Sequence, residues 1–202
     1  MQALPSKLLL LFSNRFASPQ VNPHDTHKTR RFPKQHRYLY DELPYFQPRD
    51  DNRNELYLGN PKEQMGIHCR FGMKGVIAEN HFDAGRNSIA LLGGRRRYIL
   101  SHPKQCPNLA MFPVGHESAR HSQVDYTDPD VKRFPEFAHA LANEVVLEAG
   151  QVLYLPTYWF HYIVSLDLNY QCNTRSGNTD QYNQPIHDCG FKTGKQYSNH
   201  RH

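Results

Sequence analysis

The sequence predicts a mainly β protein, a sandwich or barrel of short strands with few short helices. From Met65 onward, short runs of β-branched, aromatic and leucine residues alternate with turn residues. Seven such runs occur, and the 14 prolines and 12 glycines favour tight turns over a helical bundle. A chain of 202 residues with 38% hydrophobic and 12% aromatic residues is long enough to bury a core.

The expected strands are short, and most are separated by only a few turn residues: 67–77, 88–92, 95–101, 144–147, 151–155, 161–166 and 169–174. One helix is expected at 129–134, where Asp128 can cap the first turn and Pro135 ends it. The connection at 102–143 is too long for a hairpin. It resembles the insert between the two halves of a double-stranded β-helix, the jelly roll.

Composition divides the chain into three segments: a basic, mostly irregular leader at 1–60, a strand-rich domain at 61–177, and a polar, peripheral tail at 178–202. Residues 15–37 contain six Lys or Arg and one acid, which accounts for the formal net charge of +5. A solvated leader is a better explanation for this run than a nucleic-acid or membrane contact. The remainder is close to neutral and carries no clear nucleic-acid site.

The four cysteines form no CxxC or zinc spacing, and we interpret them as ordinary thiols. No apolar run approaches the length of a membrane span. The first residues could form a weak transit peptide, so the compartment stays open, with a soluble intracellular protein favoured. Nothing in the sequence decides the oligomeric state.

The candidate metal ligands are His81, Asp83 and His161. On an extended segment, residues two apart project to the same side, so His81 and Asp83 can reach one ion. A histidine from the apolar segment around 155–161 would complete two imidazoles and one carboxylate, the facial triad of non-haem iron(II). A histidine hydrogen-bonded in the core remains an alternative for His161, and His116 with His121 could form a second site or a solvated loop.

From about residue 65 to 177, the chain resembles the Jumonji C and cupin-like 2-oxoglutarate oxygenases. The residues that carry the resemblance are 75–83 (GVIAENHFD), Asn87, 93–100 (GGRRRYIL), 150–156 (GQVLYLP), 159–161 (WFH) and Asn169. Within that family, the sequence is most similar to the branch of the asparaginyl hydroxylase that modifies hypoxia-inducible factor. The resemblance implies a double-stranded β-helix in which His81, Asp83 and His161 hold iron(II) and Asn87 and Asn169 lie beside 2-oxoglutarate.

Arg96 stands where that branch usually has a lysine for the distal carboxylate of 2-oxoglutarate, and Ala78 replaces a supporting threonine. Strand parity places Arg96 with Tyr98 on one face and Arg95 with Arg97 on the other. A buried arginine needs an anionic partner and pairs well with a carboxylate. The alternative is that all three arginines are solvated.

The sequence is compatible with three functions. The first is an iron(II) enzyme that uses 2-oxoglutarate and O2 to hydroxylate a side chain of a protein or peptide, with N-methyl-lysine demethylation as a variant. The second is a non-catalytic cupin-like binding module or a truncated, inactive oxygenase. A metal cupin that works without 2-oxoglutarate is a minor third option.

Overall fold

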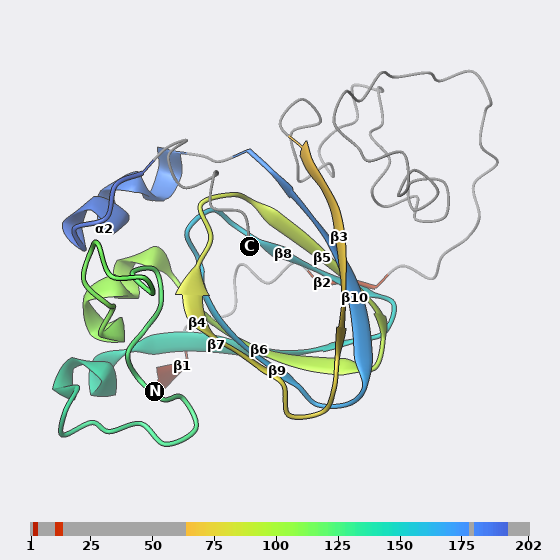
Figure 1. The fold of residues 1–202 in the computed structure, drawn as a ribbon, viewed down its shortest axis with the longest axis horizontal. Helices are drawn as coiled ribbons and strands as arrows, with labels where there is room; N and C mark the ends of the chain where they lie inside the picture. Colours follow the sequence, from red (N-terminus) through yellow and green to blue (C-terminus); the bar gives the residue numbers. More distant parts are fainter. Residues whose placement is uncertain (1, 4–10, 14–63, 178–179, 194–202) are drawn as a thin grey trace.

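Two five-stranded sheets form a jelly roll in the computed structural model, which describes residues 2–3, 11–13, 64–177 and 180–193 (Figure 1). The first sheet has the order β1-β7-β6-β9-β4 and the second the order β2-β8-β5-β10-β3. All pairings in them are antiparallel except that of β1 with β7. The sequence-based expectation of a mainly β, jelly-roll fold with few short helices is confirmed.

The strands are β1 (Gln2–Ala3), β2 (Leu11–Ser13), β3 (Gln64–Gly72), β4 (Ile77–Phe82), β5 (Asn87–Gly93), β6 (Arg95–Ser101), β7 (Leu141–Glu148), β8 (Gln151–Leu155), β9 (Phe160–Ser165) and β10 (Asn169–Ser176). The helical segments are the 3-10 turns η5 (Pro103–Leu109), η6 (Pro135–His139) and η7 (Asp180–Tyr182) and the short helix α2 (Asn183–Asp188). Among the described residues, no helix is long and apolar enough to cross a membrane.

The core lies between the two sheets, where alternate side chains of each strand point inward. Strand β6 shows the pattern clearly: Tyr98 and Leu100 are buried, whereas Arg95 and Arg97 are solvent-facing and pair with Asp167 and Glu144. This alternation confirms the parity that the sequence predicted for the three arginines. Burial of the large apolar side chains supplies the main driving force for closing the two sheets on each other.

The expected strand at 67–77 is in fact two strands, because the chain turns after β3. Gly75 has φ +84, a left-handed conformation in which glycine avoids the strain of a side chain. Its N–H donates to Ser165 O at 2.8 Å, so the turn is fixed to the end of β9. The reversal makes β4 a separate strand that contains His81 and ends directly before Asp83.

The predicted helix at 129–134 is wrong. The backbone there forms a turn in which Asp130 Oδ1 accepts hydrogen bonds from the N–H groups of Lys132 and Arg133. Pro135 begins η6 instead of ending a helix, since proline suits a first turn as well as a stop. The sequence signals were real, but they belong to elements displaced by several residues.

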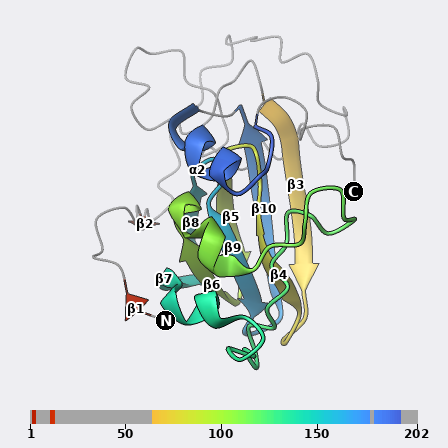
Figure 2. The same cartoon turned by 90° about the vertical axis from the view of Figure 1, so that its left-hand side faces the viewer.

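Residues 180–193, the described part of the expected tail, are not peripheral. Ile186 of α2 is fully buried, and the Phe191 ring packs edge-on against Phe82 with centroids 5.3 Å apart. Figure 2 shows α2 beside η5 of the long connection. The C-terminal segment therefore covers one end of the core next to the residues 81–83.

The interpretation of the four cysteines as ordinary thiols is also wrong. Cys69 of β3 and Cys172 of β10 lie opposite each other and form one disulfide, and Cys106 and Cys189 form the other. The partners are 103 and 83 residues apart in sequence, so only the tertiary fold brings them together. The second bridge ties η5 to the end of α2.

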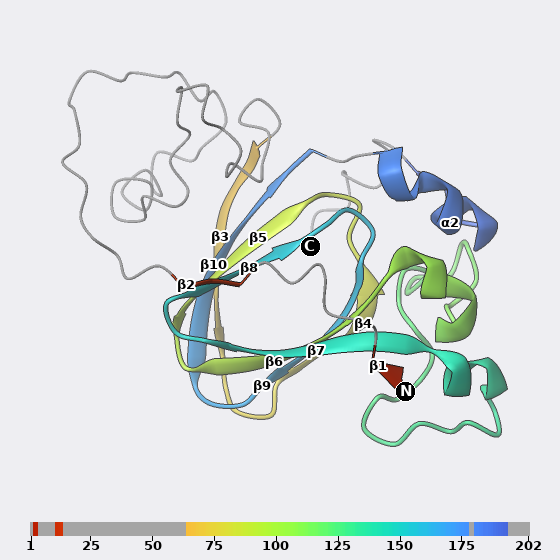
Figure 3. The same cartoon turned by 180° about the vertical axis from the view of Figure 1, so that it is seen from behind.

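Most of the leader at 1–60 lies outside the described residues. Its two described pieces join the sheets: β1 pairs in parallel with β7, as Figure 3 shows from behind, and β2 pairs with β8. The segment boundaries at 60 and 177 therefore stay a prediction. The pairing of β1 with β7 and of β2 with β8 already joins residues on the two sides of the boundary at 60.

Candidate metal centre

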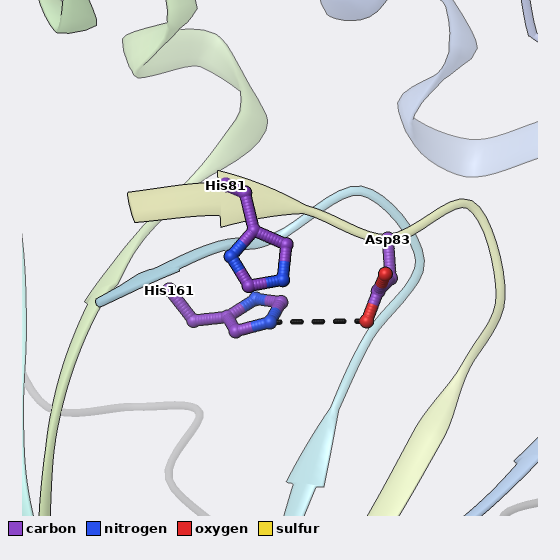
Figure 4. Close-up of side chains that lie close together, drawn as sticks. All are labelled: His81, Asp83 and His161. Atoms are coloured by element: carbon purple, nitrogen blue, oxygen red, sulfur yellow. Dashed lines mark ion pairs between the residues drawn. The ribbon is translucent and has the colours of Figure 1, made fainter. Parts of the chain in front are cut away.

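The three candidate ligands meet at one end of the barrel, where β4 and β9 pair. His81 lies directly opposite His161 in the antiparallel register, and Asp83 follows the last residue of β4. One ligand atom from each residue lies within 4.8 Å of the others, and Figure 4 shows the three side chains directed into one space. His161 Nε2 is 3.8 Å from Asp83 Oδ2. The cross-strand pairing explains how residues 80 positions apart form one site.

Backbone carbonyls orient both imidazole rings. Nδ1 of His81 is 2.7 Å from the carbonyl oxygen of Glu79, and Nδ1 of His161 is 3.0 Å from that of Trp159. In each case a carbonyl can only accept, so Nδ1 is assigned the proton and donates it. The lone pair is then on Nε2 of both rings, and this is the arrangement that metal-binding histidines use.

Burial sets the charge of the site. Desolvation, together with the neighbouring His161, lowers the pKa of His81 to about 4, and desolvation also lowers the pKa of His161. Burial acts to raise the pKa of Asp83, but the Arg175 guanidinium and the two imidazoles hold that pKa below its usual value. At neutral pH, the site therefore offers two neutral imidazoles and one carboxylate.

These residues fit a non-haem iron(II) ion. Two imidazole nitrogens and one carboxylate oxygen are the donor set of the facial triad. Within the described part of the chain, Asp83 Oδ2 is buried and accepts no hydrogen bond with acceptable geometry, so its charge is balanced by an ion pair with Arg175 alone. A bound cation would satisfy that atom. The backbone of Asp83 is fixed as well, because Tyr158 N–H donates to its carbonyl at 2.9 Å.

Two arginines that the sequence reading missed lie against the carboxylate of Asp83. Nη2 of Arg175 in β10 is 2.7 Å from Oδ2, and Nη1 of Arg120 in the long connection is 3.6 Å from Oδ1. Strand parity could have indicated Arg175, since it alternates with Asn173 and Gln171 on the face of β10 that turns into the barrel. Arg120 comes from irregular chain, for which the sequence offered no signal.

Arg96 of β6 is buried in the barrel with 8% of its surface exposed. Its Nε has no hydrogen-bond partner among the described residues, and its guanidinium carbon is 5.8 Å from the centroid of the Tyr98 ring. The Tyr98 hydroxyl in turn donates to Gln171 Oε1 at 2.9 Å. Among the described residues, no carboxylate forms an ion pair with Arg96. A buried guanidinium in this condition is an electrostatic cost that a bound anion would remove.

The two predicted asparagines lie at different ends of the barrel. Asn87 begins β5 near the metal ligands, and its Oδ1 accepts a hydrogen bond from Nδ2 of Asn173 at 3.0 Å. Asn169 lies at the far end of β10, where its Nδ2 donates to the carbonyls of Gly72 and Asp167. The structure therefore does not bring Asn169 to the metal ligands, because β10 carries it away from them. Asn173, four residues later, instead hydrogen-bonds to Asn87, and Arg175 two residues beyond it reaches Asp83.

The alternative second metal site at His116 and His121 does not form. The His116 ring stacks on Phe112, and its Nδ1 accepts the Ser118 N–H. The His121 ring instead stacks on His81 with centroids 5.0 Å apart. Among the described residues, the group of His, Cys, Asp and Glu side chains that could share an ion is His81, Asp83 and His161.

Comparison with known proteins agrees with this architecture. The model of a family described as the cupin-like domain matches residues 13–178. The chain belongs to this family. The cupin-like chain is 38% identical over 140 residues to the HSPB1-associated protein 1 of Rattus norvegicus. The aligned region covers 64% of this chain and 29% of the relative.

Two further relatives are named for demethylation or for a JmjC domain. Lysine-specific demethylase 8 of Xenopus tropicalis is 32% identical over 135 residues, covering 65% of the cupin-like chain and 30% of the relative. JmjC domain-containing protein D of Dictyostelium discoideum is 31% identical over 121 residues. That aligned region covers 60% of the cupin-like chain and 26% of the relative. The chain thus spans less than a third of the length of these curated relatives. The resemblance to the asparaginyl hydroxylase branch is not among these matches and stays a prediction.

Proposed function

We propose that this cupin-like protein is an iron(II)- and 2-oxoglutarate-dependent oxygenase that hydroxylates a side chain of a protein or peptide. One observation carries the proposal: two imidazoles with assigned tautomers and a carboxylate that accepts no aligned hydrogen bond converge in one barrel. Inside the same barrel, the buried Arg96 guanidinium forms no ion pair with a carboxylate among the described residues. This combination provides a site for a divalent cation and a site for a dianion inside one barrel.

The reaction balances as a four-electron reduction of O2. Oxidative decarboxylation of 2-oxoglutarate to succinate and CO2 supplies two electrons, and conversion of a C–H bond to C–OH supplies the other two. Iron(II), when bound, supplies the redox chemistry that couples these two oxidations. The residues of the chain bind and orient the reactants and exclude water.

Each residue has a definite task in this proposal. His81, Asp83 and His161 hold the iron, and the carbonyls of Glu79 and Trp159 keep both Nε2 atoms directed at it. Arg96 holds the distal carboxylate of 2-oxoglutarate. Asn87 and Asn173, which lie on the paired strands β5 and β10 and are already hydrogen-bonded to each other, would lie beside the bound 2-oxoglutarate.

A protein or peptide substrate agrees with the relatives, which include a protein named for its association with HSPB1 and one named as a lysine-specific demethylase. Demethylation of N-methyl-lysine would use the same chemistry, because hydroxylation of an N-methyl group leads to its loss as formaldehyde. The products distinguish the two outcomes: a retained oxygen for hydroxylation, or loss of the methyl carbon for demethylation.

The alternative function, a non-catalytic cupin-like binding module, is favoured by one observation. The Arg175 guanidinium occupies the carboxylate of Asp83 at 2.7 Å, which is where a metal would bind. An arginine that closes the site permanently would leave a fold without chemistry.

Succinate release from 2-oxoglutarate separates these functions. Full-length protein is incubated with iron(II), ascorbate and 2-oxoglutarate, in the presence and absence of a peptide pool, and succinate is measured together with peptides that gain one oxygen. We expect turnover that requires both iron and 2-oxoglutarate and that disappears in Asp83→Ala. Absence of succinate under all conditions, with iron bound, would favour the binding module. Turnover without 2-oxoglutarate would indicate a cupin that oxidises a small molecule directly.

A further inference from the structure

Arg175 is a charged group at the candidate metal centre to which the proposed chemistry gives no role. Its Nη2 lies 2.7 Å from Asp83 Oδ2, and 30% of its side chain is exposed to solvent. The same oxygen faces His161 Nε2 at 3.8 Å. A cation bound by Asp83 and His161 would therefore compete with Arg175 for one carboxylate oxygen.

The contact between Arg175 and Asp83 is close but poorly aligned. Oδ2 of Asp83 and Nε of Arg175 both lack a hydrogen-bond partner among the described residues, although the ion pair is short. An arginine that served only to orient a carboxylate ligand would usually form aligned or bidentate hydrogen bonds to it. The observed pair is held mainly by charge, so a competing cation can replace it without breaking a hydrogen-bond network.

The surroundings of Arg175 also favour its release. Arg70 of β3 and Arg120 are neighbours of the same carboxylate, and the charge of Arg175 contributes to lowering the pKa of Arg70, after burial. Among the described residues, Asp83 is the one carboxylate that acts on Arg70, His81 and His161. Arg175 is thus one of three arginines around a single acid, and a dication bound there would repel it.

We propose that Arg175 and the metal ion are alternative counter-ions of Asp83, so that Arg175 must leave the carboxylate when the metal binds. Arg175 neutralises the buried carboxylate in the metal-free protein and lowers the affinity for the metal. The proposal rests on the metal centre proposed above.

Removing the arginine gives a prediction with a definite sign. If Arg175 only supported the ligand Asp83, Arg175→Met would weaken metal binding. Because it competes, Arg175→Met should instead bind manganese(II) more tightly by about tenfold or more, the equivalent of one charge-assisted contact. Arg175→Lys, which keeps the charge, should stay near the wild type. Arg70→Met is the matched control, since it removes a nearby cation that forms no ion pair with Asp83.

The measurement is the dissociation constant for manganese(II), from the electron paramagnetic resonance signal of the free ion, with full-length protein, no 2-oxoglutarate and fixed ionic strength. Unchanged or weaker binding by Arg175→Met, with normal binding by the wild type, overturns the competition alone. If the wild type itself does not bind manganese, the metal centre fails as well, and the two failures are thereby distinguished.

A second measurement covers the case in which Arg175→Met does not fold. Zinc(II), which is diamagnetic, is titrated into the 15N-labelled wild type while the Nε–H resonance of Arg175 is followed, assigned by its absence from Arg175→Lys. Release from Asp83 predicts a shift that saturates with one equivalent of zinc. A resonance that does not move overturns the proposal.

Discussion

Replacement of Arg96 by methionine tests whether the barrel binds a dicarboxylate. Methionine keeps much of the length and apolar volume of arginine and removes the guanidinium. Arg96 is 8% exposed and has no carboxylate partner in the described part of the chain, so a bound carboxylate would be its main counter-ion. Loss of one partner from a desolvated, hydrogen-bonded charge pair costs about 2 to 5 kcal/mol.

That free energy corresponds to a rise of about 30-fold or more in the KM for 2-oxoglutarate. Succinate formation is followed as a function of 2-oxoglutarate concentration at fixed iron in the wild type, Arg96→Met, Arg96→Lys and Arg97→Met. Arg97 is the matched control, because it is the next residue in β6 but lies on the outer face with Glu144. Arg96→Lys should be intermediate, since the charge stays and the planar fork is lost.

Stability gives a second, independent readout of the same substitution. An uncompensated buried cation destabilises the fold, so Arg96→Met should leave the Tm of the ligand-free protein unchanged or raise it. Addition of 2-oxoglutarate should raise the Tm of the wild type and not that of the variant. Equal KM values for Arg96→Met and Arg97→Met would refute the assignment, and so would an equal rise in Tm on adding the ligand.

Three further predictions follow from the same structure. Burial depresses the pKa of His81 from 6.5 to about 4 in the folded state, so unfolding takes up a proton below pH 6.5. Stability is therefore retained above pH 6.5 and lost as the pH falls toward 4. For the metal-free protein, urea denaturation between pH 7.5 and 4.5 should show a loss on the order of 3 kcal/mol at the acid end, and His81→Gln should flatten the curve. Asn173→Ala should raise the KM for 2-oxoglutarate while Asn169→Ala should mainly lower the Tm; the reverse pattern would restore the sequence-based assignment of Asn169. Alkylation and mass spectrometry of unfolded, unreduced protein should find no free thiol, and reduction should release four thiols. Reduction should also lower the free energy of unfolding by about 2 to 5 kcal/mol per bridge. Alkylation of all four cysteines without reduction would contradict both pairings.

The sequence predicted the residues whose signal is local. His81 and Asp83 are two apart, and the parity of 95–101 follows from a period of two, so both were visible without a fold. The strands 95–101 and 151–155 were predicted with the bounds that the structure gives them. His161 was found through its apolar context, and its pairing with His81 across β4 and β9 supplies the geometry that the sequence could not.

The errors have a common cause in contacts that are distant along the chain. Whether Cys106 meets Cys189 depends on α2 packing against η5, and no spacing rule reports it. Asn169 and Asn173 both lie on inward-facing positions of β10, so parity allows either of them to reach the site. Which asparagine lies nearer the metal ligands depends on which end of β10 is close to the end of β4. The pairing of Arg175 with Asn87 shows that it is the C-terminal end of β10.

The distribution of charge connects these local and distant features. Asp83 is the carboxylate at the centre of a barrel end that also carries Arg120 and Arg175, with Arg96 further inside. A dication added to such a site increases the positive excess, whereas a dicarboxylate reduces it by two charges. In a buried region of low dielectric, the free energy of holding both is therefore more favourable than the sum of holding each alone. On the proposed function, the arginines would therefore favour filling the site with metal and dicarboxylate together, and the Arg175–Asp83 ion pair is the contact that the metal would have to displace.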